Sequence, residues 1–224
     1  MTCCKKILVV AAHPDDEVLG CGGVIAKHTS KGDQVHVVFM TNGVGSRYAS
    51  SKEIQEREWS AKNAANILSL SSIQQFDFPD NKMDAVALLD VVQLIERVVD
   101  KLQPEIIYTH HIGDLNIDHQ ITHKAVMTVC RPQPGFCVKE IYAFEVLSST
   151  EWQTPGLNTF CPNIFINVTD YINLKKQALG VYSKEMYTPP HSRSIDNALR
   201  LNALRGNSAG VDYAEAFILI RKIQ

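Results

Sequence analysis

Short apolar segments alternate along this chain with longer helix-forming segments, and this alternation is the feature that most restricts the fold. The run KILVVAA at 6–12 is continuously apolar, as expected of a strand buried on both faces of a parallel sheet. Three further strands are predicted, at 34–43, 72–80 and 105–111. The helices predicted between and after them span 18–32, 51–70, 88–104 and 117–131. Because strand–helix–strand units place successive strands parallel, the pattern predicts an α/β fold with helices on both faces of the sheet.

The remainder of the chain, 131–224, is less regular. It contains predicted strands at 138–146, 164–170 and 214–223, and predicted helices at 171–186 and 194–206. No repeat or linker divides the chain, so we expect one Rossmann-like, mostly parallel domain spanning 1–224. The glycines of GCGG at 20–23 do not form a dinucleotide-binding fingerprint, and we expect them to pack the first helix against the sheet.

Composition excludes several classes of partner. The chain has 224 residues, is 45% apolar and carries a net charge of −2, which is ordinary for a globular protein with a sizeable core. No basic surplus indicates nucleic acid, and no apolar run approaches the ~18 residues that a membrane span needs. The N-terminal segment MTCCKKILVVAAHPDDE lacks a small-residue cleavage site before its charges, so we interpret it as the first strand of a cytoplasmic protein. The six cysteines form no C-x-x-C pair and are expected to be reduced.

Polar residues follow several of the predicted strands at the point where each strand ends. His13, Asp15 and Asp16 follow the first strand, Asp80 follows the third, and the histidine-rich segment 110–119 follows the fourth. The carboxyl ends of parallel strands share one edge of the sheet, where ligands of such folds bind. We therefore expect one functional site at this edge.

The motif AHPDDE at 12–17 indicates a metal site. Charged groups at the end of a buried strand are costly unless something pairs with them, and a metal ion is the simplest partner. A catalytic zinc ion commonly has three protein ligands and one open position. His13 and Asp16 are three residues apart in a tight turn, so both can face one point. The histidines that could complete the site are His110, His111, His119 and His123. We favour His119, at the start of a helix, and His123, one turn further along, is a rival.

This assignment leaves Asp15 as a carboxylate beside the metal that is not itself a ligand. Zinc lowers the pKa of bound water towards ~7, and a nearby carboxylate can take the water's proton. The resulting reaction class is metal-assisted hydrolysis of an amide or ester.

The motif AHPDDE, followed about a hundred residues later by NIDH, resembles the LmbE/PIG-L family of zinc-dependent N-deacetylases. That family removes acetyl groups from N-acetylglucosamine-type sugars and their conjugates, and its second motif is H-P-D-H. The resemblance implies that His13, Asp16 and His119 bind zinc and that Asp15 is the general base. It covers residues 5–130. We accordingly divide the domain into a metal-site core at 1–130 and a variable substrate cap with a closing strand at 131–224.

The resemblance also implies roles for residues outside the metal site. Asp118 matches an aspartate that tunes the neighbouring acid group, Arg57 matches an arginine that binds the sugar, and Asp80 matches an aspartate that binds a sugar hydroxyl. In the segment HSRS at 191–194, His191 and Arg193 are candidate substrate-binding residues, and Arg193 suits a phosphate or sugar acid. A helix-capping loop explains this segment equally well.

One position departs from the family pattern. Asn116 stands where the family has the first histidine of H-P-D-H. An asparagine can donate a hydrogen bond to a developing oxyanion but cannot carry a proton. The acid that protonates the leaving amine must then be another group: His110, His111, His191, or Asp15 returning the proton that it accepted.

We therefore predict a zinc-dependent hydrolase that removes an N-acetyl or other short acyl group from an amino sugar. The substrate is a small molecule, with a nucleotide, lipid or thiol carrier left open, and a homo-oligomer is also left open. Two alternatives remain. Two histidines and one carboxylate also form the Fe²⁺ site of non-haem iron enzymes, and Asn116 leaves room for a non-catalytic sugar- or nucleotide-binding protein.

Overall fold

The computed structural model of the chain describes residues 4–47 and 50–224. The strands are β1 (Lys6–Ala11), β2 (Gln34–Thr41), β3 (Ser72–Phe78), β4 (Ile106–His110), β5 (Glu140–Phe144), β6 (Ile164–Asn167) and β7 (Ala214–Lys222). The helices are α1 (Asp16–Ser30), α2 (Ser51–Ile67), α3 (Leu88–Leu102), α4 (Ile117–Val129), α5 (Ile172–Val181) and α6 (Ile195–Asn207). All the strands and helices that we predicted are present, with ends shifted by a few residues.

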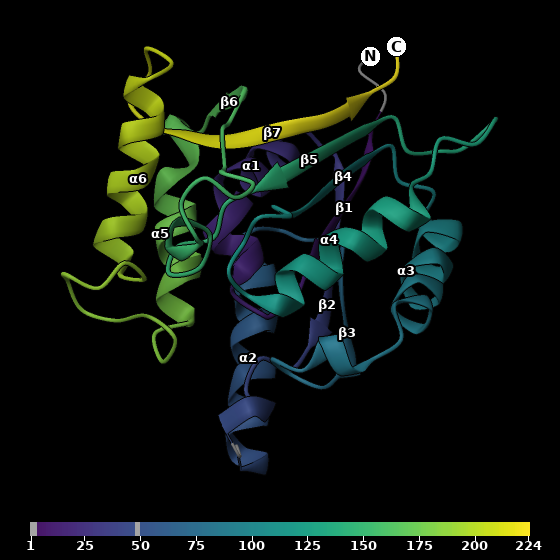
Figure 1. Cartoon of the computed structure of the whole chain (residues 1–224). Coiled ribbons are helices and arrows are strands. Elements are labelled where there is room, and N and C mark those ends of the chain that lie inside the picture. Colours follow the sequence, from purple (N-terminus) through teal and green to yellow (C-terminus); the bar gives the residue numbers. More distant parts are fainter. Residues whose placement is uncertain (1–3, 48–49) are drawn as a thin grey trace.

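The strands form one sheet in the order β3-β2-β1-β4-β5-β7-β6 (Figure 1). β1 pairs in parallel with both β2 and β4, which places it at the centre of the parallel part. β7 runs antiparallel to its neighbours β5 and β6. The prediction of a mostly parallel sheet is confirmed, and the last strand of the chain extends the same sheet.

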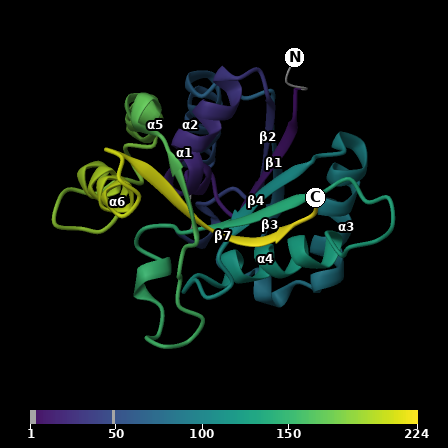
Figure 2. The ribbon, with the colours of Figure 1, turned by 90° about the horizontal axis from the view of Figure 1, so that it is seen from above.

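Helices cover both faces of the sheet, as predicted. α1, α2, α5 and α6 lie on one face, and α3 and α4 lie on the other (Figure 2). The residues of β1 alternate between the two cores, with Ile7 and Val9 on the first face and Leu8 and Val10 on the second. All four are fully buried, which explains why this strand is apolar without interruption.

The glycines of α1 allow close packing, as the sequence predicts. A side chain at Gly20 would overlap the ring of Phe144 on β5, and a Cβ at Gly23 would lie 2.8 Å from Cβ of Val168. The helix therefore approaches the sheet and the segment after β6 more closely than a larger residue would permit.

α1 begins at Asp16 and not at residue 18, as we had predicted. The chain turns into the helix directly after the motif, at Asp15, whose φ of 125° lies in a region that side-chain-bearing residues rarely adopt. Asp16 and Glu17 thus lie in the first helical turn, where the helix dipole favours the negative charge of Asp16. Glu17 differs, because burial raises the pKa of its carboxyl to about 8. The early start brings Asp16 back towards His13.

The cysteines Cys4, Cys21, Cys130, Cys137 and Cys161 are free thiols, and Cys3 lies outside the described residues. Within 4–47 and 50–224, no helix has both the length and the apolar character that crossing a bilayer requires.

Candidate active site

The candidate site lies where β1 and β4 end side by side. The turn after β1 carries His13, and the first turn of α4, which follows β4, carries Asp118 and His119. Asn116 is the N-cap of α4, and its side-chain oxygen accepts a hydrogen bond from the backbone N–H of Asp118 at 2.8 Å. This cap determines where α4 begins and hence which way its first two polar side chains project.

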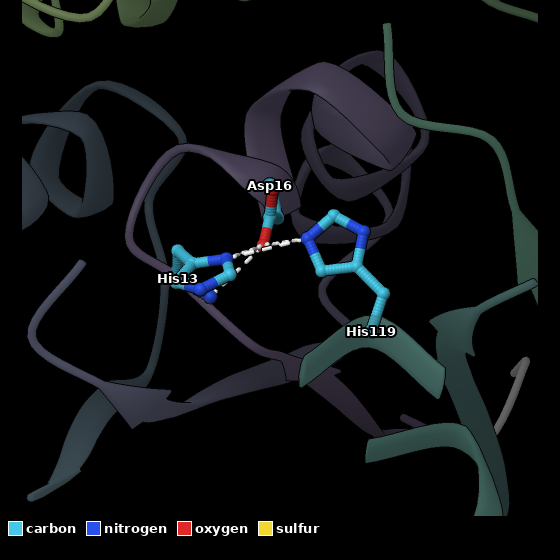
Figure 3. Close-up of side chains that lie close together, drawn as sticks. All are labelled: His13, Asp16 and His119. Atoms are coloured by element: carbon cyan, nitrogen blue, oxygen red, sulfur yellow. Dashed lines mark hydrogen bonds and ion pairs between the residues drawn. The ribbon is translucent and has the colours of Figure 1, made fainter. Parts of the chain in front are cut away.

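Three possible ligand atoms converge at this edge of the sheet. His13 Nδ1 lies 3.1 Å from Asp16 Oδ2, and His119 Nε2 lies 3.2 Å from His13 Nδ1 and 3.3 Å from Asp16 Oδ2 (Figure 3). Tetrahedral ligands at 2.0–2.1 Å from zinc are separated by about 3.3–3.4 Å. The separations therefore fit one metal ion bound by two imidazole nitrogens and one carboxylate oxygen.

In both histidines, carboxylates lie close to the ring nitrogen that faces away from the converging ligand atoms. The other ring nitrogen of His13, Nε2, lies 3.2 Å from Asp118 Oδ2 and 3.2 Å from Asp80 Oδ1. The other nitrogen of His119, Nδ1, lies 3.1 Å from Asp114 Oδ1. Carboxylates in this position are the usual supports of metal-binding histidines, because they select the tautomer and the ring orientation.

The acidic surroundings favour positive charge on the histidines. Burial opposes the charged form of His119, but Asp114 and Asp16 outweigh burial and raise its pKa to about 9. Burial likewise opposes the charge on Asp114, and nearby His119 reverses this and lowers the pKa of Asp114 well below its usual range. The cluster is therefore a negatively charged pocket that positive charge stabilises, as a cation site requires.

Asp118 is held in place by the backbone of another loop. Its Oδ2 accepts a hydrogen bond from the backbone N–H of Asn81 at 2.7 Å, and its Oδ1 accepts one from Met83 at 3.0 Å. The Asn116 side chain donates to Asn81 Oδ1 at 3.0 Å. The loop after β3 and the start of α4 are thus joined at the site.

Asp15 is completely buried between two arginines. Its Oδ2 lies 3.1 Å from Arg193 Nη1 and 3.4 Å from Arg57 Nη2, and its Oδ1 has no hydrogen-bond partner among the described residues. Its backbone N–H donates to Glu17 Oε2 at 2.9 Å, and Tyr182 donates to Glu17 Oε1 at 2.8 Å. Glu17 therefore stabilises the unusual backbone conformation of Asp15.

A cavity of about 220 Å³, which we call the site cavity, opens beside the cluster. Its lining comes from loops at the carboxyl end of the sheet and consists of His13, Gly43, Arg57, Asp80, Asn81, Asn116, Ser148, Trp152, Glu185, Tyr187, His191 and Arg193. Six of the residues singled out from the sequence line it: His13, Arg57, Asp80, Asn116, His191 and Arg193. The other four (Asp15, Asp16, Asp118 and His119) are buried beside it and do not line it.

Several histidines that the sequence left open lie elsewhere. His110 accepts a hydrogen bond from the backbone N–H of Ala12 at 2.8 Å, and burial lowers its pKa well below the usual value. His111 contacts the backbone oxygen of Asn158, and His123 contacts that of His110. Of the histidines considered as proton donors, His191 alone is among the described residues that line the site cavity. His123, the rival third ligand, lies outside the cluster formed by His13, Asp16 and His119.

Sequence reasoning missed residues that the fold brings to the site. Asp114 supports His119, and Glu185 Oε1 lies 3.0 Å from Arg57 Nη1. Trp152 and Tyr187 line the cavity and contact His191 edge-on and face-on, with ring centroids 5.7 and 4.1 Å away. Asp114 could have been found from the sequence, because it lies between the fourth strand and the pair Asp118–His119. Glu185 and Tyr187 lie in the loop after α5, and Trp152 ends a short 3-10 helix (Thr150–Trp152), so no spacing pointed to any of the three.

This chain is similar to a known protein family and to several known proteins. A family model described as "PIG-L: GlcNAc-PI de-N-acetylase" matches residues 8–130. The uncharacterized deacetylase YaiS of Escherichia coli (strain K12) is 31% identical over 181 residues, covering 78% of this chain and 89% of the relative. The 4-oxalmesaconate hydratase of Pseudomonas putida is 33% identical over 196 residues, covering 78% of this chain and 72% of the relative. The solved N,N'-diacetylchitobiose deacetylase from Pyrococcus horikoshii aligns with a TM-score of 0.79 at 21% identity, covering 97% of this chain and 84% of that one.

Proposed function

Because this chain belongs to the PIG-L family, we propose that it is a zinc-dependent hydrolase that removes an N-acetyl or other short acyl group from an amino sugar or its conjugate. The observation that carries the proposal is the convergence of His13, Asp16 and His119 next to Asp15, a buried carboxylate with an oxygen that no described group occupies. A metal site and a spare base side by side suit hydrolysis.

His13, Asp16 and His119 would hold the metal. When bound, zinc polarises the amide carbonyl and makes a water molecule more acidic. Two nitrogen ligands and one oxygen ligand suit zinc, and they suit Fe²⁺ as well. We therefore propose Zn²⁺ as the cofactor, with Fe²⁺ as the competing metal.

Asp15 is the proposed general base. Its Oδ1 is the atom that accepts the proton of the attacking water, because Oδ2 already faces the guanidinium groups of Arg57 and Arg193. Those two arginines compensate the buried charge of the carboxylate. Both also line the site cavity, so they connect the base to whatever the cavity binds.

The lining of the site cavity supplies the proposed substrate contacts. Arg57 and Asp80 offer a donor and an acceptor for sugar hydroxyls, and Asn116 can donate through its amide. His191 is the proposed acid for the leaving amine. Its Nδ1 accepts the backbone N–H of Arg193 at 3.0 Å, which leaves Nε2 to carry the proton. Return of the proton by Asp15 is the alternative route.

A hydratase is the second candidate, because the Pseudomonas relative at 33% identity is one. The charges of the site cavity argue against a substrate with several carboxylates. Arg57 and Arg193 are each within ion-pair distance of a carboxylate, and Asp80 and Glu185 lie on the same lining, so no positive surplus remains. A neutral sugar amide fits this balance better.

The test is the release of free amine from N-acetylglucosamine derivatives (free sugar, nucleotide-linked and glycoside-linked) with added zinc. We expect turnover by the wild type and a loss of about 10²–10⁴-fold in kcat for Asp15→Asn, because the amide cannot accept the proton. Zinc binding should persist in this variant. The matched control is Asp100→Asn, an exposed aspartate near the end of α3, which should retain full activity.

Three outcomes would replace the proposal. Hydration of an unsaturated oxo-acid without any amine release would favour the hydratase. Oxygen-dependent turnover with Fe²⁺ would favour a non-haem iron enzyme. Saturable sugar binding that is equal in wild type and Asp15→Asn, with no turnover by either, would favour a binding protein.

A further inference from the structure

Asp15 has a backbone conformation that a residue with a side chain rarely adopts. Its φ is 125°, and it is the residue at which the chain turns into α1. Strained conformations of this kind persist only where surrounding contacts enforce them. Asp15 does not enforce its own, because its carboxylate makes no capping hydrogen bond to the described backbone of α1. Another residue must therefore hold this turn.

Glu17 makes the contact that holds the turn. Its Oε2 accepts a hydrogen bond from the backbone N–H of Asp15 at 2.9 Å. A glutamate side chain has several rotatable bonds, so it restrains its partner only if its own position is fixed. Tyr182 fixes it, because the Tyr182 hydroxyl donates to Glu17 Oε1 at 2.8 Å. A hydrogen-bonded path thus joins Tyr182, in the segment after α5, to the proposed base.

Tyr182 is itself rigidly placed. Its side chain is 1% exposed and belongs to the core on the α1 side of the sheet. The helix that precedes it, α5, packs against both α1 and α2 (Figure 2). Ser60 of α2 donates to the backbone oxygen of Val181 at 3.0 Å, directly before Tyr182. Tyr182 therefore cannot move without disturbing the core, and it can serve as a fixed point for Glu17.

Tyr182 also supports the carboxylate of Asp15, by a separate route. The guanidinium carbon of Arg57 lies 5.6 Å from the centre of the Tyr182 ring, within the range of a cation–π contact. Arg57 Nη2 in turn lies 3.4 Å from Asp15 Oδ2. The backbone N–H of Glu185 donates to the backbone oxygen of Tyr182 at 2.8 Å, and its Oε1 pairs with Arg57 Nη1. One turn of chain after α5 therefore meets both ends of the base.

Packing alone does not explain the Tyr182 hydroxyl. A phenylalanine would fill the same space in the core without bringing a polar atom that needs a partner. Tyr182 lies outside the described lining of the site cavity, so its hydroxyl does not contact a ligand bound there. Its bond to Glu17 is the contact that distinguishes tyrosine from phenylalanine at this position.

We propose that Tyr182 is a positioning residue for the general base. Its hydroxyl holds Glu17, and Glu17 holds the backbone of Asp15 at the positive φ from which the Asp15 carboxylate reaches the site. This inference rests on the proposed function, because it takes Asp15 to be the base. It gives the part of the chain beyond residues 8–130, the segment that the family model matches, a share in catalysis.

Tyr182→Phe removes the hydroxyl and keeps the ring. At saturating zinc, we expect kcat for amine release to fall by roughly tenfold with KM little changed, because the base is misplaced while the substrate contacts remain. The matched control is Tyr108→Phe, which removes another buried hydroxyl bonded to α1, 3.1 Å from His28 Nε2. It should leave kcat unchanged. An unchanged kcat in Tyr182→Phe, an equal loss in both variants, or a change confined to KM would overturn the proposal.

Substitutions of Glu17 test the path between Tyr182 and Asp15. Glutamine can still accept the Asp15 N–H through its amide oxygen and can donate to the Tyr182 hydroxyl, whereas methionine can do neither. Glu17→Gln should therefore lose less kcat than Glu17→Met. Adding Tyr182→Phe to Glu17→Met should cost little more, because both act through one contact. Equal losses in Glu17→Gln and Glu17→Met, or fully additive losses in the double variant, would contradict the path.

Urea unfolding separates this inference from the proposed function. Glycine adopts positive φ without strain, so Asp15→Gly removes the need for the hold. Tyr182→Phe should lower the urea midpoint more in the wild type than in the Asp15→Gly background. If it does so in a protein that releases no amine, the hold on Asp15 stands and the proposed function fails. Amine release with equal midpoint shifts in the two backgrounds would overturn the positioning role and leave the proposed function intact.

Discussion

Individual carboxylates lie against the two histidines that we propose as metal ligands. Asp114 and Asp118 each lie close to the ring nitrogen that faces away from the converging atoms. A neutral amide in that position would accept a hydrogen bond but would not stabilise positive charge on the imidazole. The supporting carboxylates should therefore matter to metal affinity although they contact no metal themselves.

Asp114→Asn should weaken zinc binding by about 10–100-fold, because the amide supports His119 less well than a carboxylate does. Competition with a fluorescent chelator measures the affinity. Asp114 also accepts a hydrogen bond from Thr150 Oγ1 at 2.6 Å. Thr150→Val removes this bond and keeps the carboxylate, so it tests whether the lost contact with the segment after β5 by itself explains the loss of zinc affinity. An equal loss of affinity in Thr150→Val would contradict the role assigned to Asp114.

His28 gives the stability a pH dependence that is separate from the candidate site. Its Nδ1 lies 2.8 Å from Asp33 Oδ2 and its Nε2 lies 3.1 Å from the Tyr108 hydroxyl, and burial lowers its pKa below the usual 6.5. The unfolded chain therefore binds more protons at this position. The contribution of His28 to stability is complete above pH 6.5 and is lost as the pH falls through the folded-state pKa.

In His28→Gln, the free energy of unfolding should fall less between about pH 7 and pH 5 than it does in the wild type. Urea unfolding at both pH values measures the difference. The window stays above the range in which Asp33 titrates, since the pKa of Asp33 is itself lowered, by the hydrogen bond from His28 against the opposing effect of burial. A steeper loss of stability in His28→Gln would refute the assignment.

At the scale of elements, α1 depends on a buried ion pair from distant parts of the chain. The helix is interrupted at Cys21, whose φ of −147° is not helical. Glu215 of β7 accepts hydrogen bonds from the backbone N–H groups of Gly23 and Val24, at 2.9 and 2.7 Å, and Lys175 of α5 donates to the backbone oxygen of Leu19 at 2.9 Å. The two side chains pair with each other at 2.6 Å. They satisfy backbone groups that the interruption leaves without helical partners.

Lys175→Met should lower the free energy of unfolding by about 3–5 kcal/mol, because it leaves the Glu215 charge buried without its partner. Denaturant unfolding is the measurement. Lys176→Met, at the exposed neighbouring position, is the matched control and should change stability by no more than about 0.5 kcal/mol. If the free energy of unfolding fell equally in the two variants, the Lys175–Glu215 ion pair would not be the source of the stabilisation.

At the scale of the whole molecule, the cluster joins segments that are far apart in the chain. His13 and His119 are separated by 106 positions, and they meet because β1 and β4 are neighbours in the sheet. A metal bound between them would cross-link two parts of the folded chain and would have no comparable site in the unfolded one. Metal binding should therefore stabilise the entire fold.

Zinc at a hundred times its dissociation constant should stabilise the protein by about 2.7 kcal/mol relative to protein treated with a chelator. Thermal unfolding with and without zinc measures this shift. His119→Gln should abolish most of it, whereas His123→Gln, one turn along α4, should preserve it. A zinc-dependent shift that survives His119→Gln and disappears in His123→Gln would reverse the choice of third ligand.

Much of the fold was predictable, because each element depends on local patterns. The apolar run of β1 predicted a central strand, and the helical spacing of residues 88–104 predicted α3. The misjudged start of α1 has a physical reason: the turn depends on the positive φ of Asp15, which Glu17 stabilises, and no periodicity reveals such a contact. The pairing of His13 with Asp16 was predictable from their spacing, since residues three apart in a tight turn after a strand can face one point.

The sequence by itself determined the alternation of strands and helices, the edge of the sheet where polar groups gather, and the His13–Asp16 pair. Only the tertiary structure decided that His119 meets this pair, that Asp114 supports it, and that Trp152, Tyr187 and His191 line one cavity. The physical reason is the range of the interactions. Periodicity and turn geometry act over a few residues, whereas the lining of a cavity depends on how irregular loops pack after the sheet has brought their ends together.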